Sequence, residues 1–306
     1  MRLIGLLLLL LLTVAPGVWA NTCDCDIPPE QVTLYDTLLI LNPEQQSTAI
    51  VTHLPWGVPI ASEFATGEHL LIQTDYILDY DNDLQVPLWA AYRLTAADID
   101  AKRNRTECFR PDPRLAQEAA ADCADYDEPI FDRGHLVPNA DMTRSEAAMI
   151  NTYLFSNMTP QYANFNRIIW SRLEGLVRDW AKTRGAIYVI SGTIFDRDND
   201  DWRDLDEAAE FVAPTLRVAI PTAFYKIIVA PTANSLDSIT LLLPHATEKH
   251  TGREGLNYLE THITSIDRIE TLTGVDFFPE FDEQSEEQLE ATIAPQLWRR
   301  GNFVQQ

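Results

Sequence analysis

A histidine preceded by an acid, a base and a glycine forms the densest group of reactive side chains in this sequence. Asp132, Arg133, Gly134 and His135 follow one another directly after Phe131. Imidazole is the side chain used most often as a general base near neutral pH, and a neighbouring arginine stabilises developing negative charge. The tetrapeptide alone is also typical of a surface turn with an ion pair, so a catalytic interpretation needs partners elsewhere in the chain.

Suitable partners occur downstream, on a predicted helix. Asn166 and Glu174 are eight positions apart, which places them two helical turns apart on roughly the same face. Carboxamide and carboxylate oxygens suit a magnesium-type cation, so the set predicts phosphodiester hydrolysis: His135 deprotonates water while the cation neutralises the phosphate and the departing oxygen. For Asn157, Asn164 and Asn166, near the start of this helix, capping is the alternative role.

The elements that must position these residues read as strand, strand and helix. Short extended segments are expected at 130–137 and 151–156, and apolar residues recur at helical spacing over 164–182. A hairpin precedes them, with an extended segment from 69 to 80, a turn at 81–83 and a returning strand at 86–94. Further strands are predicted at 186–191, 216–220, 224–230 and 239–243.

This pattern predicts an α+β fold with one central, mainly antiparallel sheet. The ordering of composition along the chain suggests four parts. They are a signal peptide at 1–20, an N-terminal arm at 21–65, the main domain at 66–282, and a polar helix or tail at 283–306.

Four separated motifs, in order along the chain, resemble those of the DNA/RNA non-specific endonucleases, the family of the Serratia nuclease and endonuclease G. The similarity covers roughly residues 70 to 280 and includes the hairpin segment PLWAAYR at 87–93. The motifs are FDRGHLVPNADM at 131–142, YLFSNMTPQ at 153–161, FNRIIWSRLE at 165–174 and TGVDFFP at 273–279.

The resemblance implies a role for each matching residue. His135 corresponds to the catalytic histidine, Asn166 to the directly bound metal ligand, and Glu174 to the acid that holds metal-bound water. Arg133 corresponds to an arginine near the phosphate, and Asn157 to an asparagine beside the active site, for which a purely structural role is the alternative. The two strands and the helix would form a ββα-metal finger around Mg²⁺, with Mn²⁺ or another divalent ion as substitutes.

One family arginine, which precedes a Phe and an Asp, transfers less directly. Arg105, followed by Phe109 and Asp112, is the best match, although Arg103 and Arg110 lie close by. The resemblance further implies DNA and RNA as substrates and products with 5′-phosphates; some relatives form homodimers, and the sequence leaves the oligomeric state of this chain open. An inactive relative that only binds nucleic acid or protein, and a phosphodiesterase for small substrates in a closed pocket, are the alternatives.

The four cysteines and the N-terminus both bear on the compartment. An apolar stretch at 3–14 and small residues before a cleavage point at Ala20 indicate a signal peptide, with a retained anchor as the alternative and no stable membrane association otherwise expected. Behind an export signal, disulfides are permitted. We expect Cys108 to pair with Cys123 across a short polar loop, which leaves the pairing of Cys23 and Cys25 open; a zinc site is the weaker interpretation.

The charge of the chain is unusual for a protein that acts on nucleic acid. The full sequence has 23 basic and 46 acidic residues, a net charge of −23; loss of Arg2 with the signal leaves 22 against 46, or −24. Divalent cations or a local arginine cluster would have to replace long-range attraction, and solubility outside the cell is the favoured reason for the acidity. An Asp-rich run at 196–206 could hold calcium, but it lacks the glycine and final glutamate of an EF-hand loop, which favours a solvated turn.

Overall fold

In the computed structural model of the chain, the residues described are 23–61, 69–100, 103–127, 129–195, 210–211, 218–233 and 235–298. The expected signal peptide, the Asp-rich run at 196–206 and the last residues of the expected C-terminal tail lie outside these ranges. Within them, no helix combines the length and the apolar character needed to cross a bilayer.

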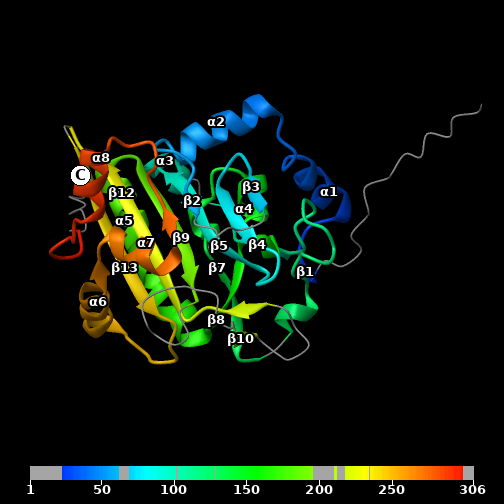
Figure 1. Cartoon of the computed structure of the whole chain (residues 1–306). Helices are drawn as coiled ribbons and strands as arrows, with labels where there is room; N and C mark the ends of the chain where they lie inside the picture. The colour runs from blue at the N-terminus through cyan, green and yellow to red at the C-terminus, as the bar shows by residue number, and fades with distance from the viewer. Residues whose placement is uncertain are drawn as a thin grey trace, which may run out of the picture.

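A seven-stranded sheet, antiparallel at every pairing, runs through the centre of the molecule (Figure 1). The strand order is β14-β13-β12-β9-β5-β4-β3. The expectation of a central, mainly antiparallel sheet is therefore confirmed. The strands are β3 (His69–Ile72), β4 (Ile77–Asp81), β5 (Val86–Leu94), β9 (Ile187–Ile194), β12 (Ala223–Pro231), β13 (Leu236–Pro244) and β14 (Ile263–Thr264).

Short ribbons and helices surround the sheet, with α8 at one side of the view in Figure 1 and α1 with β1 at the other. The two-stranded ribbons pair β1 (Cys23–Cys25) with β6 (Cys108–Phe109), β15 (Val275–Asp276) with β2 (Ile60–Ala61), β10 (Glu210–Phe211) with β11 (Ala219–Ile220), and β7 (Phe131–His135) with β8 (Met158–Tyr162). The α-helices are α1 (Pro29–Thr37), α2 (Pro43–His53), α3 (Ala96–Ile99), α4 (Glu146–Asn151), α5 (Ser171–Arg184), α6 (Gly252–Thr261), α7 (Ile266–Thr273) and α8 (Glu283–Glu290). Single turns are η1 (Ala124–Tyr126), η2 (Asn139–Asp141), η3 (Phe155–Asn157) and the π-helical η4 (Phe165–Trp170).

Both faces of the sheet are covered by apolar cores. Successive side chains of a strand point to opposite faces, so each strand contributes to both cores. On β12, Phe224 and Ile228 belong to the core on the α5 side, whereas Tyr225 and Ile227 belong to the core on the α7 side. The near-continuous apolar run of this strand follows from burial on both faces. Helix α5 is thereby fixed against the sheet by its own apolar stripe, with Trp180 fully buried.

The segment 69–94 contains one more turn than the hairpin predicted from the sequence. The segment expected to be extended from 69 to 80 is two paired strands, β3 and β4, joined by a tight turn in which Gln73 N donates to Tyr76 O at 3.2 Å. The predicted turn at 81–83 is present, and Asp81 Oδ1 accepts from the backbone N–H groups of Asp83 and Leu84 at 2.9 and 2.8 Å. Such side-chain bonds favour a turn over continued strand.

The prediction of a strand at 151–156 was wrong. These residues end α4 and form η3, and their backbone bonds are local, as from Tyr153 N to Ile150 O at 3.1 Å and from Asn157 N to Leu154 O at 2.9 Å. The strand that pairs with β7 is β8, which begins at Met158 and contains Pro160. A proline is tolerated there because an edge strand needs hydrogen bonds on one side only.

We predict that Gly192→Ala, in the middle of β9, lowers the free energy of unfolding by about 1–3 kcal/mol, because overpacking a core displaces its neighbours. An added Cβ would collide with the Tyr225 hydroxyl and lie 2.5 Å from the Leu88 carbonyl oxygen. Gly175→Ala on α5 is the control: its nearest contact is Arg178 Nη2 at 3.9 Å, so alanine should stabilise by up to about 1 kcal/mol. Urea unfolding measures the stability of both variants. A midpoint of Gly192→Ala equal to that of the wild type would contradict the close packing around Gly192.

Candidate active site

The ribbon β7–β8 and the helical segment η4–α5 form a ββα unit that carries the sequence motifs. In the ribbon, Gly134 lies opposite Thr159 and His135 opposite Met158. The buried Gln161 side chain crosses Gly134 so closely that a Cβ there would lie 2.5 Å from its Oε1. Glycine is therefore the residue that lets the two strands and this side chain pack together.

One cavity, open to solvent and of about 450 Å³, collects most of the residues expected in the site. His135, Asn166 and Glu174 all line it. Five arginines also line it: Arg103, Arg105, Arg133, Arg167 and Arg178. Asn157 and the cysteines are not part of the lining.

The imidazole of His135 is held in an apolar setting at the edge of this cavity. Its ring meets Tyr153 edge-on, with centroids 5.1 Å apart, and its carbonyl accepts from Trp170 Nε1 at 3.1 Å. Burial, and then the nearby Arg105 guanidinium, lower the pKa of His135 to about 3. The buried Nε2 has no hydrogen-bond partner among the described residues. A neutral ring with an unengaged nitrogen is suited to accept a proton.

Asp132 orients the amide expected to hold the metal. Asn166 Nδ2 donates to Asp132 Oδ2 at 3.0 Å, and the guanidinium of Arg167 donates to the same carboxylate at 2.8 and 2.5 Å. Because the amide nitrogen is engaged, the amide oxygen of Asn166 is left for another partner. Asn166 belongs to the π-helical turn η4, a rare conformation that often marks functional sites.

Glu174 lies among cationic groups and one other carboxylate. Burial raises its pKa, and the positive charge of Lys226 opposes that rise most strongly. Arg178, one turn later on α5, donates to Asp141 Oδ1 at 2.9 Å, and Tyr92 donates to Asp141 Oδ2 at 2.7 Å. The site therefore contains a carboxylate whose ionisation is balanced between burial and neighbouring charge.

Lys226 is fully buried on β12 and faces the site from the sheet. Its Nζ bonds to Ser191 Oγ and lies 4.4 Å from the Trp170 ring centroid. Burial lowers the pKa of Lys226, and the carboxylates of Glu174 and Asp141 oppose that shift. A cation inside the sheet thus compensates part of the negative charge on α5.

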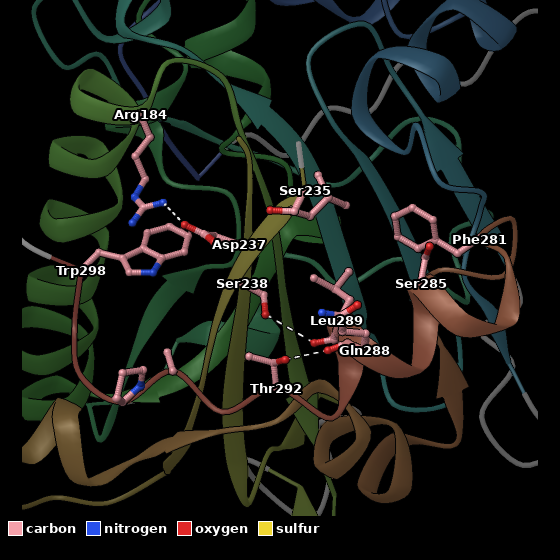
Figure 2. Close-up of a pocket in the computed structure, with 13 residues that line it drawn as sticks. Arg184, Ser235, Asp237, Ser238, Phe281, Ser285, Gln288, Leu289, Thr292 and Trp298 are labelled. Atoms are coloured by element: carbon pink, nitrogen blue, oxygen red, sulfur yellow. Dashed lines mark hydrogen bonds and ion pairs between the residues drawn. The ribbon is translucent and has the colours of Figure 1, made fainter. Parts of the chain in front are cut away.

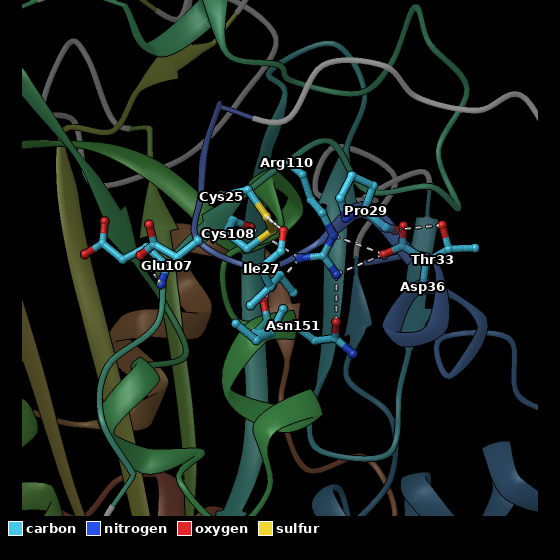
Figure 3. The surroundings of a disulfide bond; sticks show 11 residues. Cys25, Ile27, Pro29, Thr33, Asp36, Glu107, Cys108, Arg110 and Asn151 are labelled. Atoms are coloured by element: carbon cyan, nitrogen blue, oxygen red, sulfur yellow. Dashed lines mark hydrogen bonds and ion pairs between the residues drawn. A yellow bond between two sulfur atoms is a disulfide. The ribbon is translucent and has the colours of Figure 1, made fainter. Parts of the chain in front are cut away.

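The arginine loop contains the three arginines, Arg103, Arg105 and Arg110, among which the sequence left the choice open. Arg110 is buried and structural, since its guanidinium bonds to Asp36 at 2.9 Å and to Asn151 Oδ1 at 2.8 Å (Figure 3). Arg105 is exposed, pairs with Glu107 at 2.8 Å, and lies 5.8 Å from the Tyr153 ring centroid. Both Arg103 and Arg105 reach the cavity, whereas Arg110 does not.

The expected disulfide between Cys108 and Cys123 was wrong. The structure joins Cys23 to Cys123 and Cys25 to Cys108, and Figure 3 shows the second bond. The cause is a non-local strand pairing: β1 pairs with β6, which sets Cys25 opposite Cys108. The bonds fasten the N-terminal segment to the arginine loop, and Asp24 between the two cysteines pairs with Arg133 at 3.0 Å.

Asn157 lies behind the site and bonds only to backbone atoms. Its fully buried side chain accepts from Val137 N at 3.0 Å and donates to Val137 O at 3.0 Å and to Thr152 O at 2.9 Å. These bonds hold the segment that follows His135. The geometry matches the structural alternative noted for this residue.

Four charged residues in or beside the site were missed by the sequence reasoning, among them Arg167, which stood within a motif without a role. Arg178 could have been found, because it follows Glu174 by four residues and so shares its helix face. Asp132 stood within the motif but received no role. Lys226 left a fainter signal, a lone lysine inside the apolar strand segment FYKIIVA at 224–230.

A larger cavity, of about 530 Å³, lies elsewhere and contains none of the motif residues (Figure 2). It is bordered by α8, the start of β13 and the segment that ends at Trp298. Its charged groups are paired, since Arg184 bonds to Asp237 at 2.7 Å and stacks over Trp298 at 3.8 Å. The smaller cavity is therefore the one equipped for catalysis.

Comparison with known proteins agrees with this assignment. The profile of the family described as DNA/RNA non-specific endonuclease matches residues 60–284. The chain is 29% identical to a mitochondrial nuclease EXOG of Danio rerio over 224 residues, which are 72% of this chain but only 63% of that protein, less than two thirds of its length. It is 32% identical to a nuclease of Syncephalastrum racemosum, covering 70% of this chain and 68% of the relative.

The fold also matches a solved relative. One chain from the crystal structure of the EndoG/EndoGI complex, which concerns the mechanism of EndoG inhibition, superposes on this protein with a TM-score of 0.66. The two sequences are 25% identical. The match covers 80% of this chain and 96% of that one. From the profile match, the relatives and the shared fold, this chain belongs to the DNA/RNA non-specific endonuclease family of divalent-metal-dependent nucleases.

Proposed function

We propose that this protein is a secreted endonuclease that hydrolyses phosphodiester bonds of DNA and RNA with little sequence preference and with the help of a divalent cation. The observation that carries the proposal is the content of one open cavity: a neutral imidazole with an unengaged nitrogen, an oriented amide, a carboxylate and five arginines. General base, oxygen donors and phosphate-binding cations are the parts that such a reaction needs.

His135 is the general base in this proposal. Its low pKa keeps the ring neutral at ordinary pH, and the surrounding Tyr153 and Phe109 rings exclude water from its sides. A water molecule bound in the cavity would transfer its proton to the neutral imidazole of His135 and attack the phosphorus. The bond to the 3′-oxygen breaks, and the phosphate stays on the 5′ end of the product.

The donor set fits a hard divalent cation. Asn166 offers its amide oxygen, since the amide nitrogen is engaged by Asp132, and Glu174 offers a carboxylate in the same cavity. Oxygen ligands with room for several waters suit Mg²⁺, or Mn²⁺ in its place. When bound, such an ion supplies Lewis-acid stabilisation of charge on the phosphate and the departing oxygen.

The arginines supply the positive charge that the protein as a whole lacks. Arg105 and Arg133 face the cavity from the loop and from β7, and Arg178 faces it from α5. Guanidinium groups bind phosphate oxygens well and read the backbone, not the bases, so low sequence preference follows. The open cavity admits a polymer, which favours a nuclease over a phosphodiesterase with a closed pocket.

Export agrees with the two disulfides. Disulfides form and persist in oxidising compartments, and both described here join segments that are distant in the sequence. Together with the apolar N-terminal stretch at 3–14, they support secretion followed by cleavage near Ala20.

We predict that the chain from residue 21 onward cleaves plasmid DNA and RNA with Mg²⁺ and loses this activity in excess chelator. His135→Ala should lower the rate by a factor of about 10² to 10⁴, the usual contribution of a general base. His69→Ala, on the edge strand β3, is the matched control and should keep full activity. No cleavage with any of several divalent metals would refute the nuclease, and undiminished cleavage by His135→Ala would refute its role as the base.

We predict an acid limb of kcat/KM well below pH 6, measured on a short oligonucleotide at saturating metal. The base works only when neutral, so activity falls as the pH drops through the lowered pKa of His135. Arg105→Gln removes one cause of the lowering and should move the limb to higher pH. Arg103 lines the same cavity but does not contribute to the lowered pKa of His135. The acid limb of Arg103→Gln should therefore stay at the wild-type pH. Identical limbs in both variants would contradict this account.

We predict that Asn157→Ala lowers the free energy of unfolding by about 3 kcal/mol, because it leaves buried backbone groups of Val137 and Thr152 without partners. Asn139→Ala loses only a weak bond of 3.5 Å to Met149 O and should change stability much less. Denaturant unfolding measures both. Full stability with lost activity in Asn157→Ala would instead place this residue in the chemistry.

A further inference from the structure

Five carboxylates from three elements gather on the side of the molecule where α7 and α8 meet. Asp267 and Glu270 lie on α7, Asp276 on β15, and Glu286 and Glu290 on α8. One oxygen each from Asp267, Glu270 and Glu290 lie within 4.8 Å of one another, and so do those from Asp276, Glu286 and Glu290. None of these residues lines the active-site cavity.

Glu290 is shared by both groups and is the buried member of the cluster. Its residue exposure is 7%, and its Oε1 has no hydrogen-bond partner among the described residues. Glu270, by comparison, accepts from Phe277 N at 2.8 Å. A buried carboxylate oxygen without a donor is unfavourable unless a proton or a cation satisfies it.

The charges around Glu290 are of its own sign. Burial raises its pKa most, followed by the charges of Glu270 and Glu286, a hydrogen bond that the Glu290 and Glu270 carboxyl groups share, and the charge of Asp276. Burial and nearby carboxylates also raise the pKa of Glu270, Asp267 and Glu286. No lysine or arginine is among the groups that shift these four residues. The cluster therefore differs from Glu174, which has Lys226 and Arg178 as neighbours.

We propose that this cluster is a second divalent-cation site, separate from the catalytic one, and that it binds calcium. All of its donors are carboxylate oxygens, which suit a hard cation and exclude one that prefers nitrogen or sulfur. Calcium accepts six to eight oxygens in flexible geometry, so carboxylates from three elements can serve together. The buried oxygen of Glu290 marks the centre of the site.

The ion would act as a structural link. It would join α7 and β15 to α8, and β15 pairs with β2 from the N-terminal part of the chain. The opposite side of α8 already faces β13, where Ser238 Oγ donates to Leu289 O at 3.5 Å (Figure 2). Calcium would therefore fasten α8 through the side that carries Glu286 and Glu290.

Thermal unfolding of the full mature chain, stripped with chelator, tests the proposal together with equilibrium dialysis of calcium. We expect calcium at about 100 times its Kd to raise the Tm of the wild type by about 5 °C or more. Glu290→Gln should lose this rise while its metal-free Tm is no lower than that of the wild type, because the amide removes a buried like charge. Glu260→Gln, exposed on α6 and outside both groups, should keep the rise.

Two further variants distinguish this site from the catalytic one. Asn166→Ala should retain both the Tm rise and the calcium measured by dialysis, so a failed nuclease proposal leaves this test intact. Asp276→Asn, an exposed substitution whose amide oxygen can still accept from Phe278 N, should weaken calcium binding about tenfold. A full response in Glu290→Gln, a response abolished by Asn166→Ala, or no calcium bound to the wild type at millimolar concentration would each overturn the proposal.

Discussion

The carboxylate of Asp132 links the strand that carries the base to the helix that carries the oxygen donors. It accepts from the Asn166 amide at 3.0 Å and from Arg167 Nε at 2.8 Å, while His135 lies three residues further along the same strand. Imidazole and amide are thereby held by regular elements, whose positions are more reproducible than those of loops. The sheet serves the same end, because it holds α5 through a continuous apolar face.

The distribution of charge explains how so acidic a protein can act on a polyanion. Its net charge is −23, yet five arginines line the active-site cavity and a buried lysine lies beneath it. Among the described residues, five acids gather instead between α7, β15 and α8, away from the cavity. The electrostatic potential at the cavity, and not the net charge of the whole protein, decides whether phosphate can approach.

Local patterns were sufficient for β5, β9, β12 and β13 of the central sheet, for strand β7 and for the helix that follows β8, because hydrophobic period and motif depend on neighbouring residues. The failures came from contacts distant in sequence. The pairing of β1 with β6 decided the disulfides, and the burial of Tyr153 and Phe155 in a turn made 151–156 look like a strand. Lys226 acquires its place only when β12 packs beneath Trp170. The π-helical turn at Asn166 leaves no periodic signal of its own.

The two disulfides also impose an order on the making of the molecule. Cys23 and Cys25 emerge from the ribosome long before their partners, which follow 100 and 83 residues later. Neither native bond can form until that stretch of chain has been synthesised and folded back on the N-terminus. The loop carrying Arg105 lies inside both covalent rings, so it is tied to the N-terminus first through Cys108 and then also through Cys123. An oxidant that acts too early finds only Cys23 and Cys25 to join, so the timing of oxidation relative to synthesis governs how much protein reaches the native pairing.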